Sequence, residues 1–325
     1  MTTYKEIFGK YVKNYSSDPT SDIEGQVWYN STTGVFKTNL AGAAAWASGG
    51  NMGTARYRLA GAGTQTAGLG FGGATAGPIN QSATEEYDGS AWTAGGTMGT
   101  ARRSLSGAGL QTAGLAFGGS AATVSNATEE YDGSAWTGGG NMSTARRNLG
   151  GAGIQTLALG FGGYTTTVVA NTEEYDGSAW TAGGNLATAR RELRGAGTQT
   201  AGLAFGGDTG GATAVTATEE YDGSAWTGGG NLGTARYGHG GAGIQTAGLA
   251  FGGYTGTVNT AVTEEYNGTS WTASTSMATA RAFLGNSGTQ TSALGFGGYT
   301  TTGVANTEEY TGLSFIDNVK TITTS

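Results

Sequence analysis

The sequence predicts an all-β protein: one propeller of six four-stranded blades with a short N-terminal extension. Three motifs recur six times along the 325 residues, at intervals of 44 to 46 residues: an Arg after Thr-Ala, a Phe-Gly-Gly and a Glu-Glu-Tyr. The arginines are Arg56, Arg102, Arg146, Arg190, Arg236 and Arg281. The Glu-Glu-Tyr motifs end at Tyr87, Tyr131, Tyr175, Tyr221, Tyr266 and Tyr310. Repeats of this length are typical of propeller blades.

Each repeat divides into four expected strands. In the second repeat the first strand is expected over 104–109 and the second over 113–118, while the third ends at Tyr131 and the fourth centres on Trp136. Asp132-Gly133 lies between the last two and predicts a hairpin, because glycine accepts a positive φ. The double glycine that follows each phenylalanine closes the second strand.

Closure of the ring is predicted from the ends of the repeat array. Trp46 has no Glu-Glu-Tyr before it, and the last Glu-Glu-Tyr, at Tyr310, has no Trp-to-Arg segment after it. A strand around Trp46 would therefore complete the sixth blade and remove an exposed sheet edge. Phe315 competes for the same position, but Met52 and Arg56 also fit the repeat and favour Trp46. We expect an extension over residues 1–39, the propeller over 40–315 and a tail over 316–325.

Composition excludes several classes of protein. The net charge is −7 with no basic block, so the charge pattern of a nucleic-acid-binding protein is missing. The absence of cysteine excludes disulfides and cysteine-based zinc sites. The N-terminus lacks the apolar core of a signal peptide, and no apolar run is long enough to cross a membrane. We expect no secretion by an ordinary signal and no membrane insertion.

The extension carries an aromatic stripe. Tyr4, Phe8, Tyr11 and Tyr15 lie at helical spacing, with polar residues on the other side, which predicts an amphipathic helix over 4–15. Such a helix either packs on its own propeller or serves as an anchor that docks on a partner. Downstream, apolar residues on both sides of Ser-Thr-Thr-Gly34 predict a small hairpin over 27–37.

The repeats resemble the kelch family of propellers. The matching features are the double glycine after an apolar strand, Tyr-Asp then Trp after a turn, Met four residues before Arg, and Arg236-Tyr-Gly-His239 as an Arg-x-x-His. Asp-Gly in place of Asp-Pro and the near absence of proline depart from that pattern. The resemblance covers about residues 40–315 and implies blade architecture.

A second resemblance concerns function. Near-identical Gly/Thr-rich repeats behind the leader Trp28-Tyr-Asn-Ser-Thr-Thr-Gly34 resemble virion proteins of tailed bacteriophages. This implies a non-enzymatic structural or binding protein of the virion, assembled in the host cytoplasm. Its partners would be other virion proteins, bound through the extension, and a host-surface glycan; a homo-oligomer is left open. A bacterial lectin-like adhesin and an inert decoration or tail protein are the alternatives, and a glycan-active enzyme is disfavoured.

Most repeated side chains are expected to be structural. In a strand, Glu129 and Tyr131 share a face, so a buried Tyr131 implies a buried Glu129 that needs a partner. The Thr-Ala-Arg arginines supply that partner in equal number, which predicts a ring of Glu–Arg ion pairs. A functional acid pair is the alternative. Phe117, Tyr131 and Trp136, with their equivalents, are expected to fill the space between blades.

Enzyme hypotheses fail on the residues available. A copper oxidase on a kelch-like propeller would need several histidines and a Tyr–Cys pair, whereas this chain has one histidine and no cysteine. His239 is expected to serve in packing rather than as a ligand. We therefore expect no catalytic residue, no metal site and no cofactor.

The loop between the second and third strands is the candidate recognition surface. Between Gly-Gly and Glu-Glu lie 11, 9, 9, 11, 10 and 9 residues, and these differences account for every difference in repeat length. The loops should leave the blades on one face, where repeat insertions often bind ligands; neutral drift in exposed loops is the alternative. The candidate binding residues are Tyr164, Tyr254, Tyr299, Asp208, Asn80 and Asn126.

Overall fold

The computed structural model describes residues 13–16, 27–38 and 42–313. Contacts within the chain divide it into two units, Ala45–Thr311 and a second unit that combines Met1–Ala44 with Gly312–Ser325. The described residues contain no helix. Six four-stranded antiparallel sheets make up the first unit, so the predicted six-bladed propeller is confirmed.

Each blade has the same strand order from the axis outward. Blades 1 to 3 consist of β5 (Ala60–Gly63), β6 (Gly68–Phe71), β9 (Thr84–Tyr87) and β10 (Trp92–Ala94); β11 (Ser106–Leu110), β12 (Ala113–Phe117), β13 (Thr128–Tyr131) and β14 (Trp136–Gly138); and β15 (Gly150–Ile154), β16 (Leu157–Phe161), β17 (Thr172–Tyr175) and β18 (Trp180–Gly183). Blades 4 to 6 consist of β19 (Arg194–Gly197), β20 (Gly202–Phe205), β21 (Thr218–Tyr221) and β22 (Trp226–Gly228); β23 (Gly240–Ile244), β24 (Ala247–Phe251), β25 (Thr263–Tyr266) and β26 (Trp271–Ser274); and β27 (Gly285–Gly288), β28 (Ser292–Phe296), β29 (Thr307–Thr311) and β4 (Ala45–Ser48). A two-stranded sheet of β7 (Ala74–Thr75) and β8 (Ile79–Asn80) extends the first loop.

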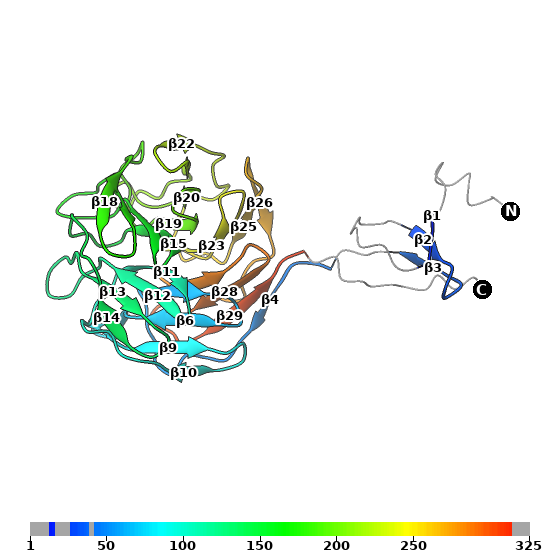
Figure 1. Cartoon of the computed structure of the whole chain (residues 1–325), viewed down its shortest axis with the longest axis horizontal. Helices are drawn as coiled ribbons and strands as arrows, with labels where there is room; N and C mark the ends of the chain where they lie inside the picture. The colour runs from blue at the N-terminus through cyan, green and yellow to red at the C-terminus, as the bar shows by residue number, and fades with distance from the viewer. Residues whose placement is uncertain (1–12, 17–26, 39–41, 314–325) are drawn as a thin grey trace. The chain divides into compact units, whose positions relative to one another are not determined.

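The ring closes as the sequence predicts. The inner strands contact one another in a closed circle, and β27 of the last blade contacts β5 of the first; Figure 1 shows the sheets arranged about a common centre. Strand β4 pairs with β29, with Trp46 opposite Tyr310. The Trp46 indole packs on Phe251 of blade 5 and donates to Thr263 Oγ1 at 3.0 Å. The competing Phe315 lies outside the described residues.

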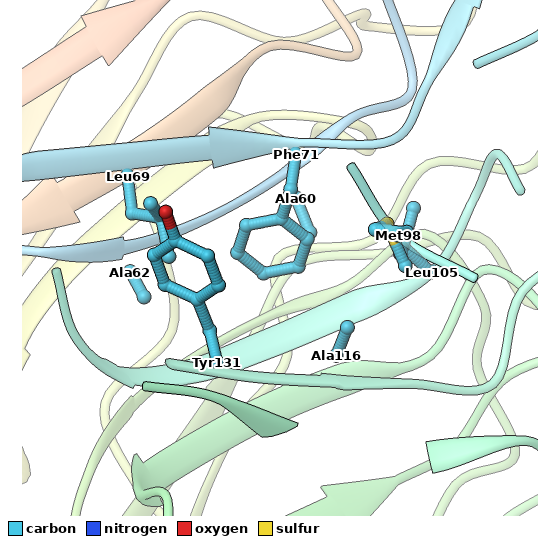
Figure 2. Packing of buried hydrophobic residues seen from close by; sticks show 8 residues of the cluster. All are labelled: Ala60, Ala62, Leu69, Phe71, Met98, Leu105, Ala116 and Tyr131. Atoms are coloured by element: carbon cyan, nitrogen blue, oxygen red, sulfur yellow. The ribbon is translucent and has the colours of Figure 1, made fainter. Parts of the chain in front are cut away.

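Large side chains fill the space between neighbouring blades. Figure 2 shows Phe71 of blade 1 and Tyr131 of blade 2 pointing into one such space, where both are fully buried. Phe71 also lies 4.9 Å, between ring centroids, from Trp136 of blade 2. Phe117 repeats this contact with Trp180 of blade 3. The expected role of these aromatic residues is confirmed, and each such burial is worth about 1.5–3 kcal/mol.

Three repeated polar contacts join each blade to the one before it. At the junction of blades 1 and 2, the Tyr131 hydroxyl donates to Glu86, and the Trp136 indole donates to Thr84 Oγ1 at 2.9 Å. Gln111 Nε2 donates to the Gly68 and Tyr87 carbonyls. The second glutamate of each Glu-Glu pair is therefore the acceptor for the tyrosine of the next blade.

The first glutamate of each pair forms the predicted buried ion pair. Arg102 is fully buried, and its Nη2 lies 2.8 Å from Glu129 Oε1. Its Nη1 donates to the Gly118 and Ala127 carbonyls, both at 2.7 Å. Burial lowers the pKa of Arg102, Glu129 acts against that shift, and the guanidinium stays charged. The remaining pairs are Arg56–Glu85, Arg146–Glu173, Arg190–Glu219, Arg236–Glu264 and Arg281–Glu308.

The N-terminal unit contains a three-stranded sheet with the order β1-β2-β3, from Lys13–Tyr15, Val27–Asn30 and Val35–Thr38. The predicted hairpin over 27–37 is confirmed. The helix expected over 4–15 is wrong where it can be compared, because Lys13–Tyr15 pairs in parallel with Trp28–Asn30. Strand pairing overrides the helical spacing there, and Tyr15 O accepts a hydrogen bond from Ser31 N at 2.9 Å. Tyr4, Phe8 and Tyr11 lie outside the described residues.

Candidate functional site

One face of the propeller carries the segments that differ between repeats. Antiparallel order places two kinds of connection at the same end of every blade: the loop from the second to the third strand, and the segment from the fourth strand to the next blade. We call this end the loop face. The opposite end, which we call the turn face, carries the tight turns, including Asp132-Gly133.

A closed ring of backbone hydrogen bonds surrounds the axis on the loop face. In each blade the second residue after the Thr-Ala-Arg arginine donates its N–H to the carbonyl of its equivalent in the preceding blade. The six residues are Arg58, Ser104, Asn148, Glu192, Gly238 and Phe283, each with φ between 53° and 59°. This left-handed backbone is strained for the five that are not glycine. The first strand of blade 2 consequently begins at Ser106 instead of the expected Ser104.

Three side chains of this ring, those of Arg58, Asn148 and Glu192, contact one another near the axis. Arg58 Nη2 lies 3.5 Å from Glu192 Oε1, which also accepts from Asn148 Nδ2 at 3.1 Å. Arg194 lines the same pocket as these side chains and donates to the carbonyls of His239 and Leu284. Burial raises the pKa of Glu192, while Arg58 and Arg191 act against that shift. The pocket that these side chains line has a volume of about 30 Å³, enough for about one water molecule.

The residue directly after each Thr-Ala-Arg arginine divides the loop face into two halves. This residue is Arg103, Arg147 and Arg191 in blades 2 to 4, and Tyr237, Ala282 and Tyr57 in blades 5, 6 and 1. Each of them forms an isolated antiparallel β-bridge with the residue that follows the double glycine of its own blade. One half of the face is therefore rich in arginine and the other is rich in aromatic residues.

The aromatic half contains the larger pocket, with a volume of about 470 Å³. It is lined by Tyr237, Tyr254, Asn259, Phe283 and Tyr299, with threonines and Val258 at its edge. Tyr237 and Tyr254 pack edge to face, with ring centroids 5.4 Å apart. None of the lining residues is charged. Ligand sites commonly have this volume and this mixture of aromatic rings with a few polar groups.

The structure brings only some of the sequence-predicted site residues together. Tyr254 and Tyr299 line the same pocket. Tyr164 lies in the arginine half, where the guanidinium carbons of Arg147 and Arg191 are 5.0 and 5.2 Å from the centre of its ring. The involvement of these tyrosines in binding stays a prediction.

The three polar candidates brace loops. Asp208 is 1% exposed, pairs with Arg191 at 2.8 Å and accepts from the backbone of its own loop. Asn80 Nδ2 donates to two carbonyls of the next loop. Asn126 Nδ2 donates to Met142 O at 2.9 Å. These groups already serve the fold, and their involvement in binding stays a prediction.

Differences in loop length do not identify Tyr237 and Phe283 as pocket residues. Both residues follow the Thr-Ala-Arg arginines, in a segment of constant length. The available signal was variation of another kind: the second residue after each arginine differs in all six repeats, and the first is Arg, Tyr or Ala, within otherwise similar sequence. A comparison of residue identities at those two positions would have added Tyr237 and Phe283 to the candidate residues.

His239 lies inside the fold, as expected of a packing residue. It is fully buried, and its ring lies 5.3 Å from that of Phe205. Neither imidazole nitrogen has a hydrogen-bond partner within the described part of the chain. Burial holds the pKa of His239 well below 6.5, and the nearby Arg236, Arg194 and Arg190 lower it further. Leucine occupies this position in the other five blades.

We predict that His239→Leu stabilises the propeller by about 1–3 kcal/mol, because it removes a buried polar group without partners. The imidazole of His239 takes up a proton near pH 6.5 in the unfolded chain, whereas in the folded chain it does so only at a much lower pH. Wild-type stability should therefore fall as the pH drops below about 6.5, and this part of the fall should be absent from the variant. Urea unfolding at pH 7.5 and 5.0 measures both effects. Equal stability with an equal pH dependence would contradict the prediction.

Comparison with solved structures shows the same fold. The chain in "Structure of YjhT" matches with a TM-score of 0.68 and 12% sequence identity, over 82% of this chain and 98% of that one. At this identity the likeness shows the fold alone. No protein-family model matches the chain, and no curated protein matches its sequence.

Two further findings concern the described residues only. No cluster of three or more His, Cys, Asp or Glu side chains is placed to hold a metal ion there. Nor is there, in the same residues, a helix with the length and apolar character needed to cross a membrane.

Proposed function

We propose that this protein is a non-enzymatic glycan-binding protein whose ligand occupies the aromatic pocket of the loop face. The observation that carries the proposal is the meeting of Tyr237, Tyr254, Phe283 and Tyr299 from two blades around about 470 Å³. Aromatic rings offer flat apolar faces, and the tyrosine hydroxyls keep a polar edge. An uncharged pocket of this kind suits a neutral sugar residue.

The structural roles of the paired glutamates support a non-enzymatic function. In each blade the first glutamate pairs with a buried arginine, and the second accepts from a tyrosine. Both groups recur in all six blades with the same partners, so none has the distinct environment that separates a catalytic acid from a base. His239 is buried, and its pKa lies well below 6.5.

We further propose that the protein is a component of a tailed-phage virion, related to kelch-type propellers, with residues 1–39 as its anchor. This part rests on the sequence resemblance of the repeats and of the leader around Trp28. The extension would join other virion proteins, and the loop face would then meet the host surface. Mass spectrometry of purified particles is the direct test.

Replacing the two pocket tyrosines should strongly weaken glycan binding. We expect Tyr254→Ala with Tyr299→Ala to weaken binding of neutral oligosaccharides by roughly a hundredfold, because two stacking surfaces of about 1.4 kcal/mol each are lost. An array of neutral oligosaccharides identifies the ligand, and calorimetry compares the proteins. Tyr164→Ala, which removes a tyrosine at the equivalent position of another blade, is the matched control. Unchanged affinity in the double variant, or equal loss in the control, would reject the pocket.

A further inference from the structure

Two arginines of the loop face have no balancing carboxylate. Arg103 donates from Nη1 to Pro78 O at 2.7 Å, and the guanidinium of Arg147 lies over the ring of Tyr164. Within the described residues no carboxylate lies at ion-pair distance from either of them. Arg147 Nε is buried and has no hydrogen-bond partner among the residues that the structure describes. Both charges remain partly exposed.

Two arginines approach the ring of Tyr164. Arg147 and Arg191 approach the same ring, from blades 3 and 4, and Asp208 balances only Arg191. The charge of Arg147 is therefore uncompensated, and its cation–π contact with the ring stabilises it only in part. An anion bound at Arg147 would compensate that charge.

The turn face has the opposite character. Asp88, Asp132, Asp176 and Asp222 lie there in exposed turns. Each of these carboxyls accepts hydrogen bonds from the backbone N–H groups two and three residues later in the chain, and from the hydroxyl of the serine two residues later. These hydrogen bonds lower the pKa of each carboxyl. The molecule therefore presents negative charge on one face and unbalanced positive charge on half of the other. Such a distribution orients a protein toward an anionic surface.

We propose that the surface formed by Arg103, Arg147, Tyr164 and Arg191 binds the carboxylate groups of an acidic polysaccharide. The guanidinium fork matches a carboxylate with two parallel hydrogen bonds. Arginines in three successive blades suit a polymer with repeated acidic groups better than a single ion. Nucleic acid is less well suited, because the net charge of −7 opposes the neutralisation of many phosphates. This site lies on blades 2 to 4, whereas the aromatic pocket lies on blades 5 and 6.

The test is calorimetric titration of the full chain with polygalacturonate at low salt. Arg147→Gln and Arg103→Gln should each weaken binding by roughly tenfold, the effect of losing one charge-assisted contact. Each should also reduce the dependence of log K on log salt by about one unit. The matched control is Thr137→Glu, which changes the net charge equally but lies exposed in β14, the outer strand of blade 2. It should change affinity by less than about twofold at 0.15 M salt, where charges further apart than about 8 Å are largely screened from one another.

Several outcomes would overturn the proposal. No binding of polygalacturonate by the wild type, or an equal loss in Thr137→Glu, would remove the site. Inorganic phosphate bound more tightly, with the same dependence on Arg147, would replace the carboxylate with a phosphate ligand. Duplex DNA bound as tightly as polygalacturonate would exclude a polysaccharide-specific site. Tyr254→Ala with Tyr299→Ala should leave this binding unchanged, so the result does not depend on the aromatic pocket.

Discussion

Removal of residues 1–56 is expected to unfold or aggregate the propeller. The deletion takes away β4, and with it the strand that pairs with β29 and closes the ring. The loss of the contacts of the partly buried Trp46 should cost about 1.5–3 kcal/mol. Loss of Arg56 leaves Glu85 buried without its ion pair, at a further cost of about 3–5 kcal/mol. Together these losses approach the whole stability of a typical protein, about 5–15 kcal/mol.

Thermal unfolding and size-exclusion chromatography measure the result. The exposed edge of β29 offers unpaired backbone groups to another chain, so aggregates are the expected product. Removal of residues 1–42 is the matched control, because it deletes nearly as much sequence and keeps β4. That shorter deletion should melt within a few degrees of the full chain. Equal melting temperatures for the two deletions would show that β4 does not close the ring.

Features that repeat could be predicted from the sequence, because six copies identify a pattern that one copy leaves ambiguous. Recurring Arg and Glu-Glu-Tyr motifs predicted both the blades and the buried ion pairs. The incomplete repeat around Trp46 predicted the closing strand. In each case the evidence was a spacing, and spacing determines which residues share a strand face.

Features that join different repeats could not be predicted in the same way. The aromatic pocket combines Tyr237 and Tyr254 of blade 5 with Phe283 and Tyr299 of blade 6. Nothing in the spacing indicates that these residues approach one another around the ring. The left-handed backbone at the axis is equally hidden, because it occurs at Arg58 and Phe283, residues that rarely adopt it. That conformation depends on the hydrogen bond that each blade receives from the next.

A single substitution in one buried ion pair should have a larger effect than removal of the whole pair. Arg102→Met deletes the guanidinium and leaves Glu129 buried, with the Gly99 N–H at 2.6 Å as the one remaining hydrogen-bond partner found for its carboxylate among the described residues. Breaking a buried pair in this way costs about 3–5 kcal/mol, because the remaining charge has lost its counterion. Urea unfolding of the full chain gives the change in free energy.

The double variant Arg102→Met with Glu129→Gln is the control that separates charge from packing. It removes both charges and keeps the amide able to accept from Gly99 N–H, so the uncompensated charge disappears. It should be more stable than Arg102→Met alone, although the Gly118 and Ala127 carbonyls lose a donor in both variants. A double variant less stable than the single one would show that those carbonyl contacts, and not the ion pair, make Arg102 necessary. Because the same pair recurs in every blade, the result would apply to the whole ring.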